Sequence, residues 1–142
     1  MRLKAQKELI AAPDDVWQLL SEPYHLSDWW PGYTTVRPDR RGLAEGARWE
    51  VARGTNPRLL RRSGGEGLIV VTVVEPPVRL GWRDLQQHFD AEIRLEPAAG
   101  GHTRATLTVK APWLRLIVEE LRPVPPRALA RLHALCQTAA TL

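Results

Sequence analysis

Apolar and polar residues alternate with a period of two through the middle of the chain. In residues 88–96 every second side chain from Phe89 to Leu95 is apolar, and the residues between them are polar. The same alternation recurs in residues 2–10, 33–37, 47–53, 78–84 and 103–110. A longer β-branched run covers residues 67–75. Such segments, separated by short turns, predict an antiparallel sheet of about six to seven strands with one solvated face.

Two short helices and one long helix complete the pattern. Pro13 suits the first position of a helix, and the apolar stripe that follows it ends before Pro23. Pro23 can open a second short helix, which Pro31-Gly32 terminates. From residue 112 onward the apolar residues follow helical spacing. The prolines within residues 123–126 must break or sharply kink this helix, and its final part is expected from about Pro126.

The order of these elements predicts an α+β architecture. A sheet with one apolar face needs a cover, and the C-terminal helix is the one element long enough to lie across it. The sheet must then curl around the helix, which leaves a space between them that the two short helices can plug at one end. A chain of 142 residues is expected to form a single domain, residues 1–142.

Composition narrows the class of protein. Apolar residues make up 44% and charged residues 25%, which is typical of a globular domain. The sequence contains no run of 18 apolar residues and no apolar stretch near its start, so neither a membrane span nor a secretory signal is expected. Cys136 is the only cysteine and cannot form an internal disulfide. These features together predict a cytoplasmic protein.

The net charge is +4, and the densest cluster of basic residues in the chain consists of Arg53, Arg58, Arg61 and Arg62. This cluster falls between two predicted strands, among Gly, Asn and Pro, where it is either a solvated loop or an anion-binding loop over a ligand mouth. No aromatic residues interleave with the arginines, so the cluster is poor evidence for single-stranded nucleic acid binding, and no specific nucleic acid partner is expected.

Several local signatures resemble the helix-grip superfamily known as SRPBCC or START-like, and in particular its bacterial polyketide cyclase/dehydrase-like branch. They are AAPDDVWQLLSEPYHLSDWWPG, VVEPPVRLGWR, IRLEPAAGGHTRATLTV and the closing amphipathic helix. The resemblance implies a helix-grip fold: a curved antiparallel sheet wrapped around a long C-terminal helix, here broken by proline, with two short helices after the first strand. It also implies an interior cavity for apolar or amphipathic ligands. A few members of the superfamily close rings on poly-β-ketone chains in that cavity.

We expect the ligand to contact inward-facing residues of the sheet and the C-terminal helix, and a few polar groups at the mouth. The predicted ligand-binding residues are Trp30, Tyr33, Trp49, Val51, Arg53, Val70, Trp82, Phe89, Ala91, Leu107, Ile117, Leu121, Leu129 and His133. A filled core and a ligand cavity use the same residue types, so the sequence leaves both open. Neighbours on a helix differ by 100° in direction, which predicts Trp29 as a core anchor and Trp30 at the cavity rim or in solvent.

No catalytic residues are predicted, since the sequence offers no nucleophile with a base and an orienting group. Cys136 and His133 share a helix face, but no acidic residue is near them in sequence, and Cys136 is better explained as an inert buried thiol. Asp84 closes a strand and is expected to cap a turn. The four histidines are scattered, so neither a metal nor a cofactor is predicted.

These observations favour binding of a hydrophobic or amphipathic small molecule, such as a lipid, polyketide or quinone, without catalysis. Two alternatives stay open. One is a cyclase, aromatase or dehydratase acting on a polyketide-like chain. The other is a regulatory or interaction module that uses the Arg-rich loop of residues 53–62. The protein is expected to be a monomer or a homodimer.

Overall fold

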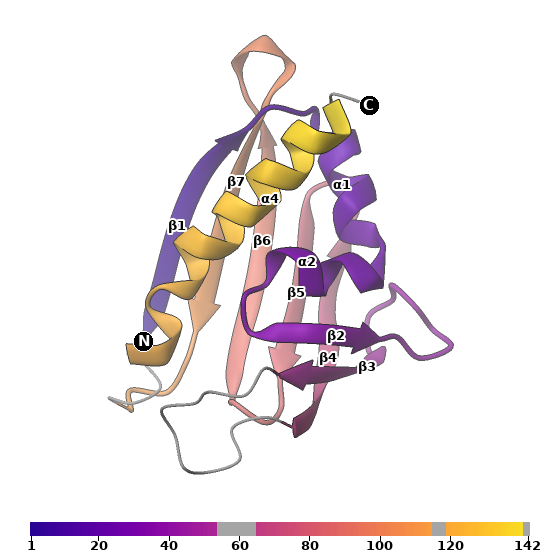
Figure 1. Cartoon of the computed structure of the whole chain (residues 1–142), viewed down its shortest axis with the longest axis vertical. Helices are drawn as coiled ribbons and strands as arrows, with labels where there is room; N and C mark the ends of the chain where they lie inside the picture. Colours follow the sequence, from indigo (N-terminus) through magenta and orange to yellow (C-terminus); the bar gives the residue numbers. More distant parts are fainter. Residues whose placement is uncertain (54–64, 115–118, 141–142) are drawn as a thin grey trace.

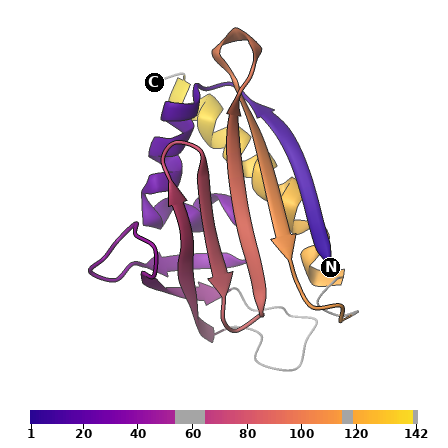
Figure 2. The same ribbon diagram turned by 180° about the vertical axis from the view of Figure 1, so that it is seen from behind.

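One antiparallel sheet of seven strands organises the computed structural model, which describes residues 1–53, 65–114 and 119–140. The strands are β1 (Arg2–Leu9), β2 (Tyr33–Arg37), β3 (Arg48–Arg53), β4 (Gly65–Glu75), β5 (Arg79–Asp84), β6 (Phe89–Pro97) and β7 (Thr103–Lys110). Their order across the sheet is β1-β7-β6-β5-β4-β3-β2, and Figure 2 shows the face opposite the helices. The predicted α+β fold and number of strands are confirmed.

The C-terminal helix α4 (Val124–Ala140) lies across the inner face of the sheet, as Figure 1 shows, where it packs mainly against β1 and β7. Its buried side chains include Ala128, Leu129, Leu132 and Cys136. Two other apolar residues of α4 lie away from this face, since Leu135 is only half-buried and Ala139 is exposed.

Two of the prolines in residues 123–126 lie at the start of α4 and not in its interior. Pro125 and Pro126 occupy the first turn, where a backbone N–H would have no partner within the helix. The helix begins at Val124, two residues before the predicted start. The break itself is present just upstream, because Arg122 and Pro123 form a turn after helical residues 119–121.

Three short elements follow β1: helix α1 (Pro13–Ser21), the 3-10 turn η1 (Pro23–His25) and helix α2 (Leu26–Trp29). Pro13 is the first residue of α1, and Pro23 opens η1, as the sequence predicts. Figure 1 places α1 and α2 on the same side of the sheet as α4, and α2 packs against both α4 and β2. The short helices thus cover the part of the inner face that α4 leaves free. A second 3-10 turn, η2 (Ala99–Gly101), joins β6 to β7.

Candidate ligand-binding site

A cluster of buried aromatic rings covers the inner face beside α2. Its members are Trp29, Trp30, Tyr33, Trp82 and Phe89. Trp30 lies at the centre: its ring stacks on Phe89 at 5.6 Å and on Tyr33 at 5.8 Å, and meets Trp82 edge-on at 5.1 Å between ring centroids. These geometries are the favourable ones for aromatic pairs. The cluster joins α2, β2, β5 and β6 into one apolar wall.

The expectation that Trp30 points to the cavity rim or to solvent is wrong. Trp30 is 2% exposed and Trp29 is 1% exposed. Trp30 is the C-terminal cap of α2 (φ −87°, ψ 115°), and its indole stacks on Tyr33 and Phe89 beyond the end of this short helix. The direction that Trp30 takes from the helix is therefore also covered by the core, and its ring meets that of Trp29 edge-on at 6.2 Å.

A small polar cluster adjoins this aromatic wall and consists of Tyr33, Arg53 and Asp84. The Asp84 Oδ2 atom accepts a hydrogen bond from the Tyr33 hydroxyl at 2.8 Å and forms an ion pair with the Arg53 guanidinium. Its Oδ1 atom accepts the backbone N–H groups of Gln86 at 3.0 Å and Gln87 at 2.8 Å. No part of the Asp84 side chain is exposed, and only 9% of the Arg53 side chain is.

The strand register explains how these three side chains meet. Tyr33 on β2 is paired with Arg53 on β3, so their side chains start from neighbouring positions on the inner face. Arg53 reaches Asp84 on β5 across β4, where Gly67 has no side chain. A Cβ atom at Gly67 would lie 2.6 Å from the Gln86 Oε1 atom and 3.5 Å from the Arg53 guanidinium. The contact with Arg53 would be an ordinary van der Waals distance, so a larger residue here would mainly displace the Gln86 side chain.

Burial sets the protonation state of Tyr33. Loss of hydration raises the pKa of its hydroxyl well above the ordinary value, and the negative charge of Asp84 and the hydrogen bond to it raise the pKa further. Tyr33 is therefore neutral near pH 7 and donates a hydrogen bond to Asp84, while its oxygen accepts a hydrogen bond from the Trp82 Nε1–H at 3.3 Å. In the same polar cluster, the Nε–H of Arg53 is buried and has no hydrogen-bond partner among the described residues.

Most of the predicted ligand-binding residues do face the inside of the molecule. Those buried outside the two clusters are Trp49, Val51, Ala91, Leu107, Leu121 and Leu129. His133 is half-buried on α4. Ile117 lies outside the described residues. Whether these side chains contact a ligand or only fill the core stays a prediction.

One predicted contact residue, Val70, is on the wrong face. It pairs with Arg48 on β3 and Arg83 on β5, whose side chains are both exposed. Ile69 and Val71, its neighbours on β4, are the buried ones. Residues 68–71 of β4 are all apolar, so no alternation in this run shows which side chains point inward.

The sequence did not indicate Asp84 as a site residue, and it placed Arg53 both at the end of the strand of residues 47–53, as a ligand-binding residue, and in the Arg-rich loop. Asp84 does cap the turn after β5, as expected, but it also holds Tyr33 and Arg53. Alternation along β5 could have revealed this, because it places Asp84 on the same face as Leu80 and Trp82. Arg53 is the last residue of β3 with a buried side chain, so it does not belong to a solvated loop. The other arginines of that cluster lie outside the described residues.

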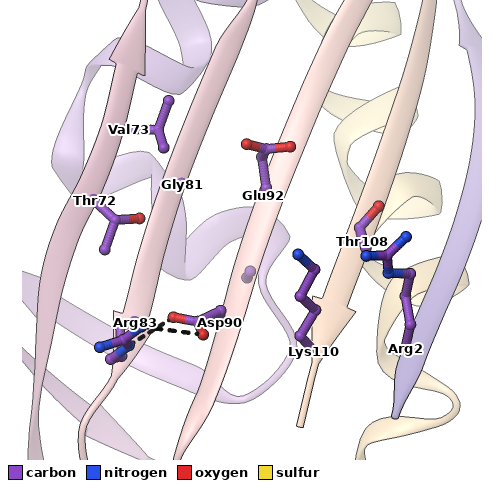
Figure 3. Close-up of a pocket in the computed structure, with 10 residues that line it drawn as sticks. Arg2, Thr72, Val73, Gly81, Arg83, Asp90, Glu92, Thr108 and Lys110 are labelled. Atoms are coloured by element: carbon purple, nitrogen blue, oxygen red, sulfur yellow. Dashed lines mark hydrogen bonds and ion pairs between the residues drawn. The ribbon is translucent and has the colours of Figure 1, made fainter.

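Two of the hollows on the described surface bear on the choice of site. One, of about 340 Å³, lies on the outer face of the sheet over Gly81 (Figure 3), where Arg83 and Asp90 form an ion pair with an N–O distance of 2.7 Å. The other, of about 560 Å³, lies between α1 and α4 and is lined by residues that include Leu19 and Cys136. Neither hollow is lined by Tyr33, Arg53 or Asp84.

Comparison with known families identifies the class of the chain. A family model described as "Polyketide cyclase / dehydrase and lipid transport" matches residues 1–137. The chain belongs to this family. The resemblance that the sequence motifs indicated is thereby confirmed. No protein among those with curated functions matches the chain.

Several solved structures share the fold of this chain. Protein NE0264 from Nitrosomonas europaea is 22% identical with a TM-score of 0.75, and the alignment covers 100% of this chain and 97% of that one. Protein MLL2253 from Mesorhizobium loti is 17% identical with a TM-score of 0.75, covering 97% and 98%. DynU16, a protein of the dynemicin biosynthetic locus, is 21% identical with a TM-score of 0.71, covering 97% of this chain and 48% of DynU16.

The described residues contain neither a candidate membrane-spanning helix nor a candidate metal site. None of the helices in this part of the chain is both long and apolar enough to cross a membrane. Within the same residues, no three His, Cys, Asp or Glu side chains gather in a way that would hold a metal ion.

Proposed function

We propose that this member of the family binds a hydrophobic or amphipathic small molecule in a cavity between the inner face of the sheet and α4, and does so without catalysis. The observation that carries the proposal is the polar cluster of Tyr33, Arg53 and Asp84 beside an aromatic wall. Ligand sites combine apolar walls with a few fixed polar groups that orient the ligand. Both parts are present on the face that α2 and α4 cover, and the family description includes lipid transport.

Binding is favoured over catalysis because the polar cluster contains no free acid or base. Asp84 accepts four hydrogen bonds, which occupy both of its oxygens. Tyr33 keeps its proton and donates a hydrogen bond to Asp84. Ring closure of a poly-β-ketone needs proton transfer at carbon and oxygen, and a general base must have a lone pair within reach of the substrate. Neither residue offers one.

A fluorescence titration tests the proposal. The six tryptophans report binding, and the aromatic wall contains three of them, whereas Trp113 is 77% exposed. Fatty acids, quinones and aromatic polyketides are titrated into the wild-type protein and into Trp113→Phe. We expect a saturable change in fluorescence with at least one class, retained in Trp113→Phe. Saturation lost in that variant would show binding at the surface around Trp113, and no saturation with any class would exclude the proposed function.

Native mass spectrometry of protein purified without detergent gives an independent measurement. A small molecule that stays bound through purification would appear as an added mass and could be identified. For the catalytic alternative, which the family description also supports, the same protein is incubated with a reactive poly-β-ketone. If cyclised or dehydrated product forms faster with the protein than in buffer, the protein is a catalyst and the proposal of binding without catalysis is wrong.

A further inference from the structure

The hydrogen bonds of the polar cluster leave one donor without an acceptor. The carboxylate of Asp84 is occupied on both oxygens, and the hydroxyl of Tyr33 donates to Asp84 and accepts from Trp82. The Arg53 guanidinium pairs with Asp84 through one terminal nitrogen. Its Nε–H is buried without a partner among the described residues. A buried unpaired donor destabilises a fold, so an acceptor supplied by a ligand would be favourable there.

The charge of the cluster limits which acceptor fits. Arg53 carries one positive charge and Asp84 one negative charge, and both side chains are at least nine-tenths buried. Arg53 forms no ion pair with any other described residue. A carboxylate placed against the Nε–H would bring a second negative charge close to Asp84 with no cation left to balance it, and burial of an unbalanced charge is strongly unfavourable. A neutral oxygen gains the hydrogen bond without that penalty.

We propose that Arg53 selects a ligand with a neutral oxygen acceptor, such as a ketone, ester or quinone carbonyl, and discriminates against the matching carboxylate. This inference rests on the proposed function, because it assigns the polar end of the ligand that the aromatic wall would hold. Arg53 acts as a specificity-determining residue, and Asp84 is the positioning residue that neutralises its charge.

Three naphthalene probes of nearly equal shape test the proposal: 2-acetylnaphthalene, 2-isopropenylnaphthalene and 2-naphthoate. The first offers a neutral carbonyl, the second has no acceptor, and the third is anionic. Dissociation constants are measured with the wild-type protein from tryptophan fluorescence. We expect the acetyl compound to bind about tenfold more tightly than each of the other two, the usual size of one buried hydrogen bond or of one unbalanced charge at a binding site.

Two variants show whether Arg53 causes the preference for the acetyl probe. Arg53→Lys keeps the positive charge beside Asp84 but has no Nε–H, so the preference for acetyl over isopropenyl should fall to about twofold or less. Arg48→Lys is the matched control, because Arg48 lies on the same strand with an exposed side chain, and it should keep the full preference. If Arg53→Lys fails to fold, the comparison of the three probes in the wild-type protein still decides the question.

Each other outcome overturns the inference in a distinct way. Tightest binding of 2-naphthoate would show that Arg53 acts as a cation despite Asp84. Equal binding of all three probes, or an unchanged preference in Arg53→Lys, would show that the Nε–H is not reached. In these cases the proposed function stands, because saturable binding is observed. Failure of all three probes to bind would count against both the inference and the proposed function.

Discussion

At the end of β5, the Asp84 carboxylate holds a turn through one oxygen and the Tyr33–Arg53 pair through the other. The first role is common for an aspartate that closes a strand. The second brings residues of three strands together, because Arg53 on β3 reaches across β4 to Asp84 on β5. Each charge of the buried ion pair neutralises the other, so removal of one side chain would leave a buried charge without a partner.

A double-mutant cycle measures this compensation. Asp84→Asn or Arg53→Met alone leaves a buried charge without its partner, and each should lower the free energy of unfolding by about 3–5 kcal/mol. The double variant removes both charges, so its loss should be clearly smaller than the sum of the single losses. Urea denaturation of the four proteins provides the values. Additive losses would contradict the view that the two charges stabilise each other.

At the scale of elements, α4 holds the inner face of the sheet through one side of the helix. Leu132 is fully buried in that side, while Leu135, one turn further along, is half-buried. Leu132→Ala should lower the free energy of unfolding by about 2–5 kcal/mol, as for other leucines removed from a packed core. Leu135→Ala is the matched control with the same change in helix propensity, and its loss should be distinctly smaller. Equal losses in urea denaturation would place the buried face elsewhere on α4.

How well each element could be predicted depended on whether its side chains alternate. β6 and β7 were predicted within one residue of their ends, because alternating apolar residues and flanking turns mark a half-buried strand. β4 is apolar on both faces, so the direction of Val70 could not be read from it. Trp30 was misplaced because helical spacing predicts the direction of its side chain but not that Tyr33 and Phe89 cover that direction.

The polar part of the site was harder to predict than the fold for a related reason. Tyr33, Arg53 and Asp84 come from three strands, and their contact depends on the register of β2, β3, β4 and β5. Alternation predicts which face each side chain occupies, but not which residues of distant strands meet. Tyr33 and Arg53 were therefore predicted as separate groups at a cavity mouth, and their link through Asp84 emerged only from the assembled sheet.

At the scale of the whole molecule, the buried hydroxyl of Tyr33 connects folding to alkaline pH. Its pKa is raised in the folded state, so the folded protein keeps this proton to a higher pH than the unfolded chain, in which tyrosine ionises near pH 10. Below about pH 10 both states hold the proton, and the contribution to stability is complete. As the pH rises further, the unfolded state releases the proton first, and this contribution is lost until the folded hydroxyl also ionises.

The expected result is a steeper loss of stability above about pH 10 in the wild-type protein than in Tyr33→Phe, with a difference in slope of up to about 1.4 kcal/mol per pH unit. Phenylalanine keeps a ring against Trp30, so the variant changes the hydroxyl with little change in packing. Urea denaturation at several values between about pH 9 and pH 11.5 gives both slopes. Tyr24→Phe is the matched control, because Tyr24 is 58% exposed, and it should keep the wild-type slope. Parallel curves for wild type and Tyr33→Phe would mean that the Tyr33 hydroxyl ionises as readily in the folded protein as in the unfolded chain, which would contradict a pKa raised by burial and by Asp84.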